Sequence, residues 1–374
     1  MADKLSPATL LARAGKTARQ IGEPTEAQIA MAAAYHLDGD VTGVQRTYGR
    51  QANSAWEHLE AAFGSLVGGE ALAFASGMAA ATATLEVLAP RGRPVAIVRD
   101  GYYGIREAAE EIAARNGAEL LLLPSEGSEA VQAIEAKKPG LVWLESPTNP
   151  GLAVTDLRAV IEAAVVAEAR VVLDDTLVTP LGRQPFEFGA DVAIYSATKY
   201  ISGHSDLLLG LAVTADAWLA AELRHWRHSR GGIAGPFESW LCLRGMKTLE
   251  LRLTRQTENA MQIACWLEKD GRIPVTYPGL AAHPDHEIAR RDMKHFGGIV
   301  VVDAEDAEAA DALAQRLELF TDATSFGGTA SSVDRRSRWA GESARPGLLR
   351  MSIGCEAVED LIADLDQGLT GLSR

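Results

Sequence analysis

The sequence has little cysteine and no excess of positive charge. Its 374 residues include only three cysteines, which are far apart and show no C-x-x-C spacing. This pattern excludes a disulfide framework and a cysteine-based zinc site, and it is typical of a protein from a reducing compartment. The formal net charge of −14 argues against nucleic acid and anionic membranes as partners, because both attract a basic surface.

Long hydrophobic runs are also missing. No segment is apolar over the length needed to cross a bilayer, and the first residues lack the apolar core of a signal peptide. We therefore expect a cytoplasmic protein. Apolar residues make up 47% of the chain and charged residues 23%, which is ordinary for a globular protein with a large core.

The pattern of apolar residues divides the chain into three parts. Residues 1–60 show little regular pattern and are predicted to form an N-terminal arm. In residues 61–235, short apolar runs alternate with amphipathic stretches, which predicts a large α/β domain whose mostly parallel sheet is covered by helices on both faces. Residues 236–374 are predicted to start with a long linking helix, 236–269, and to continue as a smaller α+β domain. The strands expected in the two domains are 71–74, 95–98, 120–123, 141–144, 171–173, 298–302, 321–326 and 348–353.

The most informative stretch is Ser196-Ala197-Thr198-Lys199-Tyr200, which follows the apolar run 192–195. Hydroxyl groups at the end of a strand can hold a phosphate, and a lysine in a closed site can lose its proton and form a Schiff base. The combination of Ser196, Thr198 and Lys199 therefore suggests a site for pyridoxal phosphate (PLP).

Two other segments are candidates for binding the phosphate. Gly77 and Met78 follow the apolar run 71–75 and open a helix-forming segment, where free backbone N–H groups attract anions. A glycine in this place is also explained by a simple turn. Tyr48 and Arg50 form a pair in the arm that can contact a phosphate, although such pairs also occur on surfaces that bind nothing.

Three polar residues lie in or at the ends of other expected strands. Asp174 ends a strand at the edge where open α/β sheets place ligands, and its carboxylate can keep a pyridine nitrogen protonated. Asp175 can do so equally well, and either can instead cap a helix or form an ion pair. Asn149 lies between two prolines that make its loop rigid. Arg350 lies among apolar neighbours, where an arginine needs an anionic partner, either a substrate or a carboxylate of the protein.

Taken in order, these motifs resemble the cystathionine γ-synthase/γ-lyase family of PLP enzymes of cysteine and methionine metabolism. The resemblance extends from about Tyr48 to the C-terminus, and it implies the aspartate aminotransferase-like fold called fold type I. The matching segments are Tyr48-Gly49-Arg50, Ser76-Gly77-Met78, Glu145 to Pro150, Asp174 to Pro180, Ser196 to Asp206, Leu241 to Leu249 and Arg350 to Glu356.

The resemblance implies a role for each candidate residue. Lys199 would bind PLP covalently and move protons, Asp174 would pair with the pyridinium, and Tyr102 would stack on the ring, although a shift by one residue selects Tyr103 instead. The implied phosphate ligands are Gly77, Met78, Ser196 and Thr198, with Tyr48 and Arg50 entering from a neighbouring subunit. The implied ligands of the substrate are Arg350 for its carboxylate, with Asn149 and Ser325 assisting. Shared sites of this kind imply a homo-oligomer, usually a homotetramer.

The reaction is expected to be elimination at the γ carbon of cystathionine, which gives cysteine, 2-oxobutanoate and ammonia. The alternatives are a cystathionine γ-synthase acting on an O-acyl-homoserine, a cystathionine β-lyase and a methionine γ-lyase. Residues 333–339 resemble those of bacterial cystathionine γ-lyase-like proteins, but Ala330 replaces a glutamate that contacts the distal amino group of cystathionine in many relatives. A protein that kept this fold without activity is disfavoured, because Lys199, Asp174 and Arg350 are all present.

Overall fold

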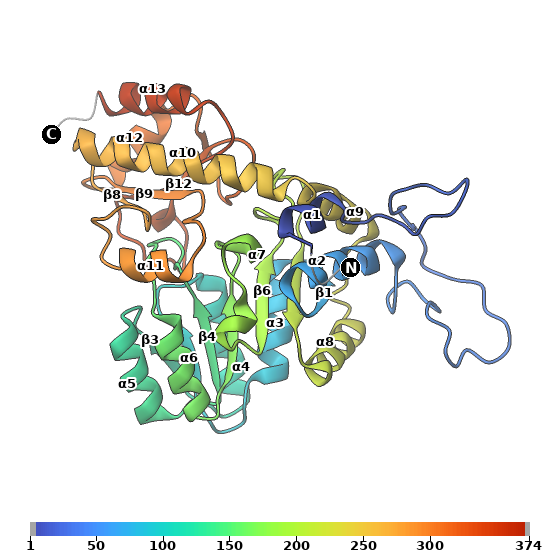
Figure 1. The fold of residues 1–374 in the computed structure, drawn as a ribbon. Coiled ribbons are helices and arrows are strands. Elements are labelled where there is room, and N and C mark those ends of the chain that lie inside the picture. Colours follow the sequence, from blue (N-terminus) through green and yellow to red (C-terminus); the bar gives the residue numbers. More distant parts are fainter. Residues whose placement is uncertain (1–4, 371–374) are drawn as a thin grey trace.

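The computed structural model describes residues 5–370, and its chain forms two sheets (Figure 1). The larger sheet has seven strands in the order β1-β7-β6-β5-β4-β2-β3, and the smaller has five in the order β10-β11-β12-β9-β8. In the larger sheet only β7 runs antiparallel to its neighbours. The predicted α/β fold, with a mostly parallel central sheet and a smaller α+β part, is confirmed.

The strands of the larger sheet are buried on both faces. They are β1 (Glu70–Phe74), β2 (Val95–Val98), β3 (Leu120–Leu123), β4 (Leu141–Glu145), β5 (Arg170–Asp174), β6 (Val192–Ser196) and β7 (Gly210–Thr214). Helices cover both sides, so most of the strands are continuous apolar runs rather than alternating ones. Their polar residues, such as Glu145, Asp174 and Ser196, stand at the carboxyl ends.

Successive side chains of each strand belong to two separate cores. Val95 and Ile97 of β2 pack with α3 (Gly77–Leu88), α4 (Tyr103–Arg115) and α8 (Ala217–Arg230). Ala96, between them, packs with α5 (Gly127–Lys137) and α6 (Leu157–Val166) on the opposite face. Short helical turns, α7 (Thr179–Gly182) and η2 (Pro185–Phe188), connect β5 to β6.

The smaller sheet differs in detail from the sequence prediction. Its strands are β8 (Val275–Thr276), β9 (Ile299–Asp303), β10 (Thr321–Asp322), β11 (Ser332–Arg335) and β12 (Leu348–Ser352). The strand expected at 321–326 is only two residues long, and β11 was not expected at all. Four helices accompany this sheet: α10 (Leu249–Asp270), α11 (His286–Asp292), α12 (Ala307–Arg316) and α13 (Val358–Leu369), the last following the 3-10 turn η3 (Arg336–Arg338) and β12.

The linking helix predicted at 236–269 is divided into α9 (Pro236–Met246) and α10. Gly245 lies so close to the backbone of Ser202 that a Cβ on it would overlap the Ser202 carbonyl oxygen. The chain turns directly afterwards, where the N–H of Thr248 donates to the carbonyl of Gly245 at 3.2 Å. The close approach therefore coincides with the break.

The N-terminal arm contains α1 (Pro7–Ala12) and runs into α2 (Ser54–Val67). Between these helices the chain extends away from both sheets, at the right of Figure 1. Several apolar side chains of this stretch, including Ile21, Met31 and Leu37, are exposed. No helix within residues 5–370 combines the length and the apolar character that a membrane span requires.

We predict that Gly245→Ala destabilises the protein by about 1–3 kcal/mol, as overpacking in a dense interior usually does. Chemical denaturation followed by circular dichroism measures the effect. Gly151→Ala is the matched control, because its Cβ would meet no atom closer than 3.9 Å. Equal stability of the two variants would contradict the close contact of Gly245 with Ser202.

Candidate active site

Residues from both sheets line one cavity of about 410 Å³ at the carboxyl ends of β4, β5 and β6. The cavity brings together most of the site residues predicted from the sequence. These are Gly77, Met78, Tyr102, Asn149, Asp174, Ser196, Thr198, Lys199, Ser325 and Arg350. Residues 201 positions apart, Asn149 and Arg350, contact each other within it.

Lys199 lies directly after β6, and its amino group is buried in the cavity. Its Nζ donates a hydrogen bond to Ser325 Oγ at 2.7 Å. Burial, helped by the positive charges of Arg350 and Arg336, lowers the pKa of Lys199 to about 8. A much larger share of this amine is therefore neutral near pH 7 than for a lysine in water, and a neutral amine is the form that attacks a carbonyl carbon.

The structure separates Asp174 from Asp175. The carboxylate of Asp174 lines the cavity, accepts a hydrogen bond from the N–H of Thr176 at 3.1 Å, and forms no ion pair with any described residue. Asp175 does not line the cavity, and it forms a buried ion pair with Arg183, with Nη2 2.5 Å from Oδ1. Burial raises the pKa of Asp174 to about 6. A buried carboxylate without a cation is suited to a ligand that brings a positive charge.

A second polar end of the cavity lies where α3 begins beside β6. Ser76 caps the helix by accepting a hydrogen bond from the N–H of Ala79 at 3.1 Å, and Gly77 and Met78 form its first turn. A Cβ on Gly77 would lie 3.0 Å from Ser196 Oγ, so the glycine keeps the space in front of that hydroxyl open. With Thr198 also in the lining, this end offers hydroxyls and helix N–H groups to an anion.

Tyr48 and Arg50 are not brought to the cavity of their own chain. Tyr48 is exposed, and its ring centroid lies 5.7 Å from the Arg50 guanidinium carbon. Arg50 Nη1 donates to the carbonyl of His228 at 2.7 Å. Their contact with a neighbouring subunit remains a prediction.

Tyr102 and Tyr103 both line the cavity at the start of α4, and their ring centroids are 5.0 Å apart. The N–H of Tyr102 donates to Glu145 Oε2 at 2.8 Å. A Cβ on Gly104 would lie 2.9 Å from the Tyr102 ring, so that ring rests against the glycine. The preference for Tyr102 over Tyr103 as the stacking residue stays a prediction.

Arg350 forms an ion pair with a carboxylate of the protein, Asp334, which is one of the two kinds of partner that its place in a strand allowed. It also lines the cavity. Its Nη2 lies 3.3 Å from Asp334 Oδ2 and donates to the carbonyl of Ser325 at 2.9 Å. Its Nη1 donates to Asn149 Oδ1 at 2.8 Å. Burial lowers the pKa of Arg350 to about 10, which still leaves it charged near pH 7.

Some residues that line the cavity had no role in the sequence analysis. Glu145, Arg336 and Trp339 are among them. Glu145 pairs with Asp174 in the register of β4 and β5, and burial together with the nearby Asp174 raises its pKa well above the usual value. A signal for Arg336 and Trp339 was present in the dense run of arginines between 335 and 339, but without β11 the side chains had no predicted direction.

The family model for Cys/Met metabolism PLP-dependent enzymes matches residues 8–370. The chain belongs to this family. PLP is its cofactor, and the cavity fits that group: its lining combines a lysine of lowered pKa, an anion seat at Gly77 and the carboxylate of Asp174, which pairs with no described cation.

Relatives with different activities are similarly close to this chain. It is 37% identical to the cystathionine gamma-lyase of Bacillus subtilis over 346 residues, covering 89% of this chain and 90% of that protein. It is also 37% identical to the cystathionine beta-lyase of Coxiella burnetii over 337 residues, covering 86% and 87%. The structure of a cystathionine gamma synthase from Xanthomonas oryzae in complex with cystathionine matches with a TM-score of 0.93 and 34% identity, over 98% of each chain.

We predict opposite effects for the two neighbouring aspartates. Asp174→Asn should weaken PLP binding roughly tenfold or more, the size expected for a lost charge-assisted hydrogen bond. Because Asp174 forms no ion pair with any described residue, its replacement strands no partner charge, and the apoprotein of this variant should not be less stable. Asp175→Asn should instead destabilise the apoprotein by about 3–5 kcal/mol, because Arg183 loses its buried partner.

Equilibrium dialysis against PLP and chemical denaturation of the apoprotein measure these two effects. Reversed results, with weaker PLP binding for Asp175→Asn and lower stability for Asp174→Asn, would contradict the assignment of Asp174 to the cofactor.

Proposed function

We propose that this protein is a carbon–sulfur lyase that eliminates at the γ carbon of cystathionine. Cystathionine and water give cysteine, 2-oxobutanoate and ammonia. The observation that carries the proposal is that Lys199, whose amine has a lowered pKa, lines one cavity together with Asp174 and Arg350. The choice of γ-elimination is supported by the likeness of residues 333–339 to bacterial γ-lyase-like proteins and by the similar Bacillus subtilis enzyme.

The residues of the cavity have separate tasks in this reaction. PLP, when bound, withdraws electrons from the carbon atoms next to the amino group of the substrate. Asp174 would keep the ring nitrogen protonated, and Tyr102 would stack on the ring. Gly77, Met78, Ser196 and Thr198 hold the phosphate through N–H groups and hydroxyls.

Lys199 moves the protons. Its neutral amine would take the proton from Cα of the substrate and would have to give that proton up before it can act as a base again. The same amine would then take a proton from Cβ and, once protonated, donate it to the departing sulfur at Cγ. The hydrogen bond from Nζ to Ser325 Oγ holds the amine inside the cavity. Arg350 binds the carboxylate of the substrate, and Asn149 and Ser325 orient Arg350.

We further propose a homo-oligomer, usually a tetramer in this family, in which Tyr48 and Arg50 enter the cavity of a neighbouring subunit. The extended arm supports this proposal, because the described part of the chain leaves several of its apolar side chains exposed to solvent. A cytoplasmic location is proposed because Cys242, Cys265 and Cys355 carry free thiols, which is typical of a reducing compartment.

The second candidate is a cystathionine γ-synthase, which joins cysteine to an activated homoserine. The similarity to the Xanthomonas oryzae enzyme favours it. Both reactions use the same lysine and the same carboxylate-binding arginine, so the products have to decide between them.

We predict that the purified holoenzyme forms 2-oxobutanoate from cystathionine, identified by chromatography of the derivatised keto acids. Lys199→Ala is the control and should form none, because it lacks the amine that moves the protons. Pyruvate as the sole keto acid would indicate a β-lyase. Cystathionine formed from cysteine and an O-acyl-homoserine, with no keto acid from cystathionine, would indicate the γ-synthase.

We predict that Arg350→Ala raises KM for cystathionine roughly 10- to 100-fold, as expected for the loss of a charge-assisted contact of about 1.5–3 kcal/mol. Its kcat should change much less, because the contact is made before and during the reaction. Steady-state kinetics measure both constants. An unchanged KM would place the carboxylate of the substrate elsewhere.

A further inference from the structure

Asp334 is a buried carboxylate behind the wall of the cavity. It lies in β11, directly opposite Arg350 in the antiparallel pairing of β11 with β12. Side chains of opposed residues in such a pair are on the same face of the sheet. Asp334 is 1% exposed and does not line the cavity.

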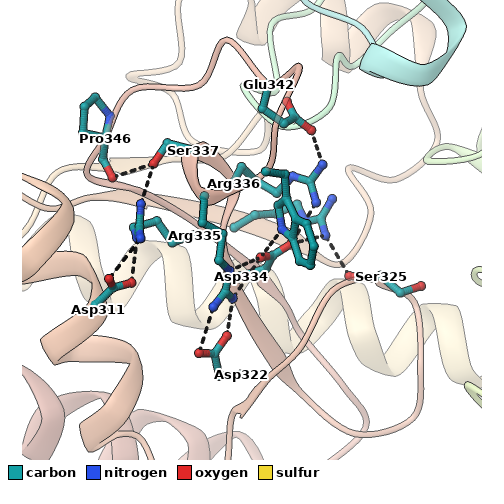
Figure 2. A network of polar contacts seen from close by, with 12 residues as sticks. Asp311, Asp322, Ser325, Asp334, Arg335, Arg336, Ser337, Glu342 and Pro346 are labelled. Atoms are coloured by element: carbon teal, nitrogen blue, oxygen red, sulfur yellow. Dashed lines mark hydrogen bonds and ion pairs between the residues drawn. The ribbon is translucent and has the colours of Figure 1, made fainter.

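Four side chains donate to this one carboxylate (Figure 2). Oδ2 accepts from Arg336 Nη1 at 2.8 Å and from Arg350 Nη2 at 3.3 Å. Oδ1 accepts from Trp339 Nε1 at 3.0 Å and from Arg338 Nε at 3.1 Å. Burial raises the pKa of Asp334, but its contacts with the arginines lower it more. The pKa therefore lies below its usual value, and Asp334 is ionised near pH 7.

Three of these four donors, Arg336, Trp339 and Arg350, line the cavity. Arg336 is held on its other side by Glu342, and Arg338 by Asp322. The cluster therefore holds three arginines against three carboxylates and is balanced in charge before any substrate binds. A cluster that is balanced in charge and buried around Asp334 can keep its side chains in one arrangement.

We propose that Asp334 is a positioning residue. It fixes the carboxylate-binding Arg350 together with two other residues that line the cavity, Arg336 and Trp339. Asp334 does not line the cavity, so it can affect the substrate only through these side chains. The proposal rests on the proposed function in one respect, that Arg350 binds the carboxylate of an amino-acid substrate.

The charges explain why a single carboxylate is needed here. Arg336 and Arg350 are both buried and close enough that each lowers the pKa of Lys199. Without a negative charge between them they repel each other, and Arg350 loses one of the contacts that aim it at the cavity. The other two, to Asn149 and to the Ser325 carbonyl, remain, but these neutral acceptors do not offset the repulsion from Arg336.

The experiment compares Asp334→Asn with Asp311→Asn in the holoenzyme. Asp311 is the matched control, because it pairs with Arg335 at 2.6 Å in the same network but is partly exposed and touches no residue that lines the cavity. The probe is L-alanine, which has the carboxylate of a substrate and no leaving group, so its dissociation constant does not depend on which reaction the enzyme catalyses. The change in PLP absorption on adding L-alanine gives this constant.

We expect Asp334→Asn to weaken L-alanine binding at least tenfold, and to raise KM for cystathionine by a similar factor while kcat stays within about threefold. PLP content and the absorption of the free holoenzyme should stay unchanged, and Asp311→Asn should match the wild type. A purely structural role would lower thermal stability but leave the dissociation constant of L-alanine and the KM for cystathionine unchanged, since neither depends on the fraction of active protein. Binding within twofold of wild type would therefore overturn the proposal.

A second variant keeps the proposal testable if Asp334→Asn does not fold. Arg338→Ala removes a partly exposed donor that does not line the cavity, so it can affect the substrate only through Asp334 and through Trp339, whose ring centroid lies 5.9 Å from its guanidinium carbon. We expect it to weaken L-alanine binding about threefold, and unchanged binding would again overturn the proposal. If the wild type binds L-alanine but forms none of the expected products, the proposed reaction fails and the role of Asp334 is still decided.

Discussion

The hydrogen bond between Arg350 and Asn149 joins the two sheets at the cavity. Arg350 belongs to the central part of the smaller sheet, and Asn149 to the loop after β4 of the larger one. The bond from Lys199 to Ser325 makes the same connection. Residues of both sheets line the cavity, so its shape depends on how the two sheets are held together.

Burial has opposite effects on the groups of this site, and both effects suit a charged ligand. It lowers the pKa of Lys199, which favours the neutral amine, and raises the pKa of Asp174 and Glu145, which makes their negative charge costly. A cofactor that reacts with the amine of Lys199 removes the need to bury its positive charge. If the same cofactor presents a protonated ring nitrogen, it also offsets the cost of the negative charge on Asp174. The protein thus holds these groups in an unfavourable state that the family's cofactor can relieve.

Much of the larger sheet and of the site was predictable from the sequence. The buried parallel strands are short apolar runs, and the polar residues at their carboxyl ends, such as Asp174 and Ser196, necessarily meet at one edge. The local pattern alone left Asp174 and Asp175 equivalent, and only the family resemblance selected Asp174, because the difference between them depends on Arg183, eight residues after Asp175. Strand β11 was missed because its residues, Ser332 to Arg335, are mostly polar and charged, and their partners come from other segments. Asp334 was missed with it. The roles of Tyr48 and Arg50 involve a second chain, which the pattern within one chain cannot position.

The ion pair of Asp175 and Arg183 has a consequence for how this lineage can vary. Asp175 stands where the resembling family pattern has asparagine, and its charge is cancelled inside the protein by a guanidinium that contacts no solvent. Neither residue can be replaced alone without stranding the other charge in the interior. The two positions are therefore expected to change together among close relatives, so the residue type at position 183 should follow the residue type at position 175.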